Sequence, residues 1–286
     1  MRILNILNGD LALAPFRASG LPGEALVWRE IYTEGPLGTG SEDPETFRRL
    51  RAHFLTGIVP DRTEPELLRG LEKMDHSLLS MTRQDHLRIW ADACMFDQGI
   101  VARVLFLTAH LERENRPRVE LLEKDAVFSD PELFRTLDRN GSVLTQEQVD
   151  FGNELWKAYA LSAPALSRPL PPVFHFMREA LERHAAERPS DGEAGLTVRR
   201  ILARTEQACS PLELFRDLAA MEKHPFLGDA SLWRIVDALS AAGHLRLTDG
   251  KGHVIEQLRR EKKELAACRI ERTDPSAENR EKGVLQ

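Results

Sequence analysis

Charged side chains follow two short apolar segments near the start of the chain, at residues 3–7 and 25–28. These side chains are Asp10, Arg29, Glu30 and Glu34. The planar guanidinium of an arginine binds phosphate or carboxylate through paired N–H donors. Carboxylates that lie close together raise one another's pKa, as general acid/base catalysis requires. These residue types therefore suit the binding of a phosphorylated ligand, or proton transfer at its reacting group.

Each of these residues also has an ordinary structural interpretation, and the sequence leaves both interpretations open. The Asn-Gly-Asp tripeptide at 8–10 is typical of a turn, so Asp10 suits a turn or a helix cap as well as a ribose hydroxyl or Mg²⁺. Arg29 suits an ion pair with Asp10, Glu30 or Glu34 as well as a ligand anion.

A second polar group follows the apolar segment 86–91 and comprises Asp92, Cys94, Asp97 and Gln98. Asp97 is expected in the first turn of a helix, where the helix dipole favours an acid; contact with a ligand is the alternative. A helix N-terminus lowers the pKa of a thiol, so Cys94 is a candidate nucleophile, although a buried cysteine is more commonly a small hydrophobic residue. The nine histidines show no metal-ligating spacing, so no metal site is expected.

The elements that must position these residues alternate between strands and helices. Strands are predicted near 3–7, 25–28, 86–91 and 119–122, and helices near 44–55, 64–81 and 96–114. This alternation predicts an α/β fold with a small, mainly parallel sheet and flanking helices, of Rossmann-like type. The carboxyl ends of parallel strands meet at one sheet edge, where ligands bind in such folds. The predicted ligand-binding residues at that edge are Asp10, Arg29, Glu30, Glu34 and Asp97.

The chain is predicted to have four parts: an α/β domain at 1–125, a helical linker region at 126–192, a winged-helix-like domain at 193–257 and a charged, partly disordered tail at 258–286. Three predicted helices followed by the hairpin signal Asp-Gly-Lys-Gly at 249–252 give the third part the order of a winged helix. Eight basic and eight acidic residues lie between 193 and 254, so charge does not support DNA binding.

Composition argues against several classes of protein. The chain has 286 residues, a formal net charge of −6 and three cysteines, which argues against a disulfide framework. No apolar stretch approaches the roughly 18 residues of a membrane-spanning helix and no signal peptide is recognised, so a cytoplasmic location without membrane contact is expected. Neither a G-x-G-x-x-G dinucleotide motif nor a Walker G-K-[ST] motif occurs.

Short motifs occur in a distinctive order along most of the chain. They are NGD at 8–10, GLPGE at 20–24, LVWRE at 26–30, EGP at 34–36, W-x-D-x-x-x-F-D-Q at 90–98 and HPFLGD-x-x-x-W-R at 224–234. Together they resemble a bacterial family, domain of unknown function 1835, over roughly residues 3–247. The resemblance implies an N-terminal α/β domain and a helical C-terminal part, and it implies no established activity. In that family an acidic–His–Asp triplet often ends the third strand and a histidine often precedes EGP, where this chain has residues 92–94 and Thr33.

The sequence therefore predicts a protein that binds a small molecule, a nucleotide or a phosphorylated metabolite, at the carboxyl edge of its N-terminal sheet. Whether it catalyses a reaction, which cofactor it uses and whether it forms a homo-oligomer are left open. The alternative is a regulator in which the α/β domain senses a ligand and the winged helix contacts DNA or a protein partner.

Overall fold

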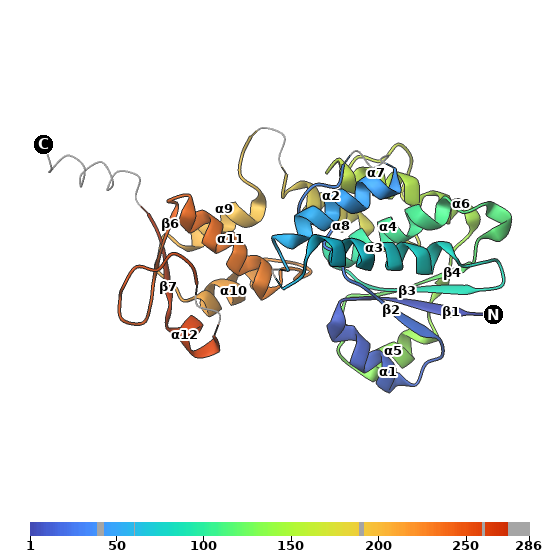
Figure 1. Cartoon of the computed structure of the whole chain (residues 1–286), viewed down its shortest axis with the longest axis horizontal. Helices are drawn as coiled ribbons and strands as arrows, with labels where there is room; N and C mark the ends of the chain where they lie inside the picture. Colours follow the sequence, from blue (N-terminus) through green and yellow to red (C-terminus); the bar gives the residue numbers. More distant parts are fainter. Residues whose placement is uncertain (39–42, 60, 189–191, 259–260, 274–286) are drawn as a thin grey trace, which may run out of the picture. The chain divides into compact units, whose positions relative to one another are not determined.

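The computed structural model describes residues 1–38, 43–59, 61–188, 192–258 and 261–273. The chain divides into two compact units, Met1–Ala185 and Ala186–Gln286 (Figure 1). Residues 274–286 of the tail expected to be disordered lie outside the described part, as do residues 189–191 of the expected linker. None of the helices in the described ranges combines the length and apolar character that crossing a bilayer requires.

A five-stranded sheet with the order β2-β1-β3-β4-β5 organises the first unit. Its strands are β1 (Ile3–Asn8), β2 (Glu24–Trp28), β3 (His86–Asp92), β4 (Arg118–Lys124) and β5 (Ser142–Val143). The first four strands run parallel to their neighbours, and β5 pairs with β4 in the antiparallel direction. The prediction of an α/β fold with a small, mainly parallel sheet is confirmed.

Helices cover both faces of this sheet (Figure 1). On one face lie α1 (Leu13–Ser19) and α5 (Pro131–Asp138); on the other lie α2 (Pro44–Thr56), α3 (Glu64–Leu79), α4 (Met95–Ala109), α7 (Gly152–Ala160) and α8 (Met177–Ala185). Successive side chains of a strand point to opposite faces. Leu7 and Trp90 therefore join the core under α1 and α5, while Ile6 and Ile89 join the larger core on the other face.

Helix α4 is buried nearly all round and packs against α3, α6 (Gln146–Asp150), α7 and α8. Gly152 permits the close approach of α7, because a Cβ there would lie 2.6 Å from the backbone carbonyl carbon of Leu105. Helices α5 to α8 fall in the region predicted as a linker at 126–192, and they belong to the first unit.

The two helices that follow β2 begin at residues whose side chains satisfy free backbone N–H groups. The Asp43 carboxylate accepts hydrogen bonds from the N–H groups of Glu45 (3.0 Å) and Thr46 (3.1 Å) before α2. Thr63 and Glu66 form a reciprocal capping box at α3. The start of α2 fixes the position of Arg51 about two turns later, and Arg51 holds the loop that follows β2.

Within the described residues, the second unit is built from four helices and a two-stranded sheet. Its elements are α9 (Leu196–Arg204), α10 (Pro211–Ala220), α11 (Asp229–Ala241), β6 (Leu245–Thr248), α12 (Lys262–Ala267) and β7 (Arg269–Arg272). Strands β6 and β7 pair antiparallel. Leu214, Trp233, Leu247 and Ile270 belong to a core of its own. The chain after β6 turns back through an Asp249 turn and contacts β6 through a single bridge, Thr248 to Val254.

Candidate functional site

The order in which successive strands are added to the sheet reverses between β1 and β3. From β1 the chain crosses to β2 on one side, whereas β3 and β4 add on the other side. Loops leave such a switch point in opposite directions and open a crevice at the carboxyl ends of the strands. Asn8 ends β1 and Asp92 ends β3, so both lie at this point.

Asp97, in the first turn of α4, fastens the two strand ends together. Its carboxylate accepts hydrogen bonds from the Asn8 side-chain amide and from the Asp92 N–H (2.8 Å). The Cys94 N–H donates to Asp92 Oδ1 (2.8 Å), and the Cys94 thiol lies 3.9 Å from Asp97 Oδ1. The polar ends of β1, β3 and α4 therefore form one hydrogen-bonded network.

Burial is the main cause of the pKa shifts in this network. It raises the pKa of Asp97 to about 8, and the charge of Asp92 acts in the same direction. Burial also raises the pKa of the Cys94 thiol well above its ordinary value, with further contributions from Asp97 and Asp92. Burial therefore disfavours the nucleophilic thiolate at Cys94 that the helix N-terminus suggested.

The network extends to β4 through Gln98. The Gln98 side-chain amide donates to the Asp92 backbone carbonyl (2.8 Å) and to Glu123 Oε1 (2.9 Å). Glu123 Oε2 accepts from the His175 N–H (3.3 Å), and His175 Nδ1 lies 3.4 Å from the same oxygen. Burial raises the pKa of Glu123. The Glu123 side chain is 3% exposed and that of His175 is 62% exposed, so His175 is the member of this pair that faces solvent.

On the β2 side, Asp10 and Arg29 form an exposed pair. The Arg29 guanidinium donates to both carboxylate oxygens of Asp10, at 2.6 and 3.0 Å. The hydrogen bond from Arg29 lowers the pKa of Asp10. Asp10 lies in the first turn of a short 3₁₀ helix and makes no capping hydrogen bond, so its ion pair replaces the cap considered from sequence.

Glu30 points away from this pair into the protein. Its carboxylate accepts hydrogen bonds from Arg51 Nη2 (2.6 Å) and Nε (3.1 Å), and both side chains are completely buried. The same guanidinium donates to the backbone carbonyls of Ile31, Glu34 and Pro36 at 2.8 to 2.9 Å. Glu30 therefore holds an internal arginine, and Glu34 takes part in that contact through its backbone.

The five predicted site residues thus fall into three places. Asp97 lies in the buried network, Asp10 and Arg29 pair at the surface, and Glu30 and Glu34 belong to the loop held by Arg51. Sequence reasoning had given no site role to three further members of the network: Asn8, Glu123 and His175. The position of Asn8 directly after an apolar strand would have indicated it, whereas His175 comes from a segment remote in sequence.

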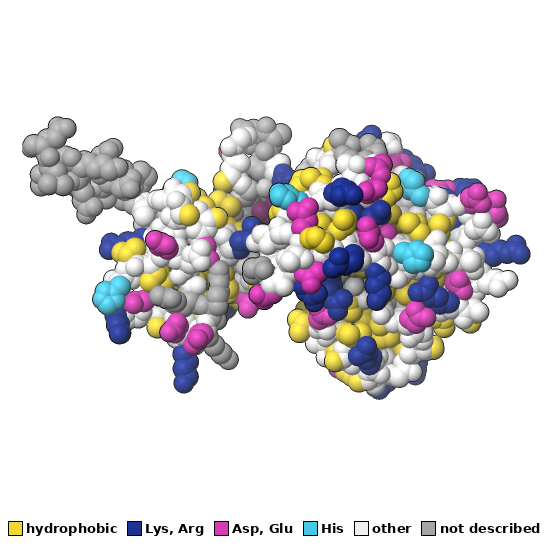
Figure 2. All heavy atoms as spheres, viewed as in Figure 1, with side chains coloured by type: hydrophobic (Ala, Val, Ile, Leu, Met, Phe, Trp, Pro, Cys, Tyr) yellow, Lys and Arg dark blue, Asp and Glu magenta, His cyan; other side chains and the backbone are white. Residues whose placement is uncertain are grey.

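Several arginines of the second unit are paired with acids. Arg199 binds Glu193 at 2.5 Å and Arg204 binds Asp217 at 2.7 Å. On the face shown in Figure 2, basic and acidic side chains are interspersed over each unit. The positive charge of these two arginines is therefore balanced within the unit.

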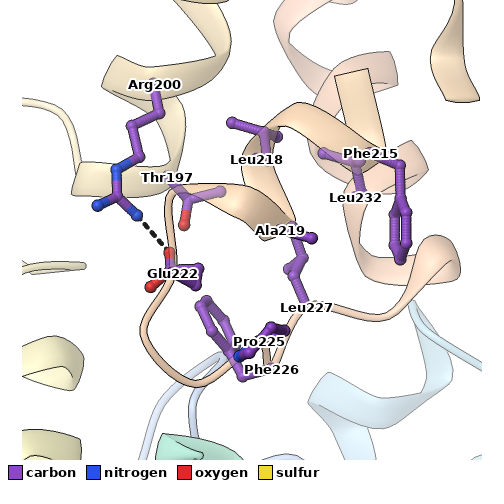
Figure 3. A pocket seen from close by; sticks show the side chains of 10 residues that line it. All are labelled: Thr197, Arg200, Phe215, Leu218, Ala219, Glu222, Pro225, Phe226, Leu227 and Leu232. Atoms are coloured by element: carbon purple, nitrogen blue, oxygen red, sulfur yellow. Dashed lines mark hydrogen bonds and ion pairs between the residues drawn. The ribbon is translucent and has the colours of Figure 1, made fainter. Parts of the chain in front are cut away.

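The second unit also has a small cavity, of about 100 Å³, between α9, α10, α11 and the connection after α10 (Figure 3). Phe215, Leu218 and Leu232 contribute apolar walls. At one end Arg200 donates to Glu222, so these two charges neutralise each other within the protein. The cavity offers apolar contact and little that would select a charged ligand.

No protein-family model matches the chain, and comparison with curated proteins and with solved structures gave no match. The resemblance to domain of unknown function 1835 therefore stays a prediction from the sequence.

Proposed function

We propose that the first unit binds a small ligand, a nucleotide or a phosphorylated metabolite, at the carboxyl edge over β1 and β3. The observation that supports this most is the convergence of polar side chains from β1, β3, β4 and α4 at the switch point, beneath which the sheet is apolar. Asn8 and Asp92 are half-buried, so both residues are partly open to solvent. They can accept or donate hydrogen bonds to hydroxyl and amino groups of a ligand.

Arg29 supplies the positive charge that a phosphate requires. Trp28 pairs with Asn8 in the strand register, so Arg29 leaves the sheet next to the switch point. Its present partner, Asp10, is as exposed as Arg29 itself. A phosphate presents two oxygens in nearly the geometry of a carboxylate and can take the place of Asp10 on the guanidinium.

The test is a thermal-shift screen of the whole protein with nucleotides and sugar phosphates. A ligand at about 100 times its Kd stabilises the native state by about 2.7 kcal/mol. Tryptophan fluorescence reports mainly on the first unit, because Trp28, Trp90 and Trp156 lie there and only Trp233 lies in the second. We expect at least one phosphorylated compound to raise the transition temperature.

Arg29→Ala should abolish that shift, whereas the matched change Arg113→Ala should keep it. Arg113 is also a surface arginine paired with an acid, Asp150, but it precedes β4 and lies at the opposite edge of the sheet. Absence of any shift in the wild type, or equal loss in both variants, would contradict the proposal.

We also propose that the second unit is of winged-helix type. Support comes from the order of three helices, α9 to α11, followed by β6, and from the antiparallel pair that β6 forms. Within the described residues, no observation favours a DNA-contacting regulator, because Arg199, Arg200 and Arg204 each bind an acid.

A further inference from the structure

We propose that Asp92, Cys94 and Asp97 bind one divalent metal ion of borderline softness, such as Zn²⁺ or Co²⁺, at the switch point. The metal site itself does not depend on the proposed function. Its use does, because the ion would lie where the small ligand is expected to bind. The spacing of the histidines predicted no metal site. The ligand atoms proposed here are instead carboxylate oxygens and a sulfur.

The geometry of the three side chains fits a small coordination sphere. One ligand atom from each residue lies within 4.8 Å of the other two, and Cys94 Sγ lies 3.9 Å from Asp97 Oδ1. Tetrahedral zinc sites with Zn–S near 2.3 Å and Zn–O near 2.0 Å place their ligand atoms roughly 3.3–3.6 Å apart. The ligand atoms, at most 4.8 Å apart, need to approach one another by at most about 1.5 Å, which side-chain torsions can supply.

A second observation is independent of these three residues. Gln98 Oε1 is fully buried and has no hydrogen-bond partner among the described residues. Its amide nitrogen donates to the carbonyl of Asp92 and to Glu123, so the amide is held beside the cluster in one orientation. Nearly all buried polar atoms in proteins form a hydrogen bond, so a buried acceptor without one indicates that a partner binds there. A cation, or a water bound to it, provides that partner.

The charge of the cluster explains why it would favour a cation, and its sulfur atom indicates which metal. The cluster brings two acidic side chains and a thiol together, and a divalent cation would balance the negative charge that they carry once deprotonated. Metal binding displaces the protons of the Cys94 thiol and of the Asp97 carboxyl, which go to solvent, and leaves one sulfur and two carboxylate groups as ligands. Thiolate selects zinc and cobalt over magnesium and calcium, which prefer oxygen ligands alone.

The experiment is cobalt titration of the whole protein in its reduced state, followed by absorption spectroscopy. Bound Co²⁺ should give a thiolate-to-cobalt charge-transfer band in the near ultraviolet that saturates at one equivalent. Cys94→Ser should remove the band. Cys268→Ser is the matched control, since Cys268 is also a buried free cysteine but lies in the second unit, and it should keep the band.

A second variant guards against loss of the band through misfolding. Asp97→Asn retains the shape of the side chain and an acceptor for the Asp92 N–H, so the fold should persist, as far-ultraviolet circular dichroism can check. Its Zn²⁺ affinity, measured by competition with a chromophoric chelator, should fall at least tenfold, since even residues that only support a ligand cost about 10–100-fold. Unchanged affinity would overturn the assignment.

The metal proposal and the ligand proposal fail in different ways. No charge-transfer band in the wild type, or a band that survives in Cys94→Ser, overturns the metal site, and thermal shifts with phosphorylated compounds in the presence of a chelator would still support the ligand site. A cobalt spectrum of the expected kind without any thermal shift supports the metal site and contradicts the proposed ligands.

Discussion

Arg29 and Glu30 are neighbours in the chain at the end of β2, yet their surroundings are opposite. Arg29 points outward and pairs with Asp10, and the two side chains are 62% and 66% exposed. Glu30 points inward and pairs with Arg51, and neither of these side chains is exposed at all. In both pairs the guanidinium Nη2 and Nε atoms donate to the two oxygens of a carboxylate, at 2.6 to 3.1 Å. The pairing geometry is alike, whereas the surroundings differ, because Arg29 faces water and Arg51 also donates to three backbone carbonyls.

This difference separates a structural pair from one that a ligand can use. A buried guanidinium that loses its carboxylate stays uncompensated in a medium of low dielectric, so the Arg51 pair cannot be exchanged for a ligand without large cost. An exposed pair is worth little, because water solvates both partners when they separate. Arg29 is therefore available to a phosphate and Arg51 is not.

The largest effect expected from this comparison is that of Glu30→Ala. The change leaves Arg51 buried without its carboxylate, so the free energy of unfolding of the first unit should fall by roughly 3–5 kcal/mol. Urea unfolding followed by tryptophan fluorescence measures it. Glu24→Ala removes an exposed carboxylate paired with Arg2 at the start of β2 and is the control. If both variants lose less than about 1 kcal/mol, the buried pair does not differ from an exposed one.

Gly35→Ala tests the loop whose carbonyls Arg51 holds. Gly35 has a φ of +69°, and a Cβ there would lie 2.5 Å from the ring of Phe54, which itself lies beneath the Arg51 guanidinium. Left-handed backbone costs a non-glycine residue roughly 1–2 kcal/mol. Displacing the ring should bring the total to roughly 2–4 kcal/mol.

Gly20→Ala is the matched control for this change. Gly20 is also left-handed, with φ +72°, but nothing lies within 4 Å of the position of its Cβ. It should lose only the backbone cost, about 1–2 kcal/mol, in the same urea experiment. Equal losses in the two variants would show that the ring of Phe54 moves without resistance.

The sheet could be predicted because each strand is a short apolar segment that ends at turn or charged residues. The segments at 3–7 and 86–91 are buried on both faces by helices, so their apolar pattern is nearly continuous. Strand β4 ends at Lys124, two residues beyond the predicted segment. The prediction stopped early because polar side chains at the end of a strand do not show where strand pairing stops.

The direction of single side chains after a strand could not be predicted. Glu30 was grouped with Arg29 because both follow β2, and no local pattern shows which of two adjacent loop residues turns inward. The partner that decides it, Arg51, lies 21 residues away on a helix. His175 likewise reaches Glu123 from 52 residues away, through a segment with no periodic pattern. Such contacts depend on tertiary packing, which sequence spacing does not encode.

A smaller effect is expected at the exposed pair. In a double-mutant cycle with Arg29→Ala and Asp10→Ala, the coupling free energy should be about 0.2–1 kcal/mol at neutral pH and should fall at high salt. Urea unfolding of the four proteins gives the value. A coupling of several kcal/mol would mean that the pair is shielded from water and would remove the reason for treating Arg29 as available to a ligand.

The smallest effect is the pH dependence of that coupling. The hydrogen bond from Arg29 lowers the pKa of Asp10 from its ordinary value of 3.8. Because the folded-state pKa is the lower one, the contribution of the pair is fully present above 3.8 and is lost as the pH falls through the folded-state pKa. The double-mutant cycle should therefore give its full coupling at neutral pH and a clearly smaller one at about pH 3. A coupling that stays constant over this range would show that the carboxylate charge is not what binds Arg29, and a phosphate would then have no advantage in replacing it.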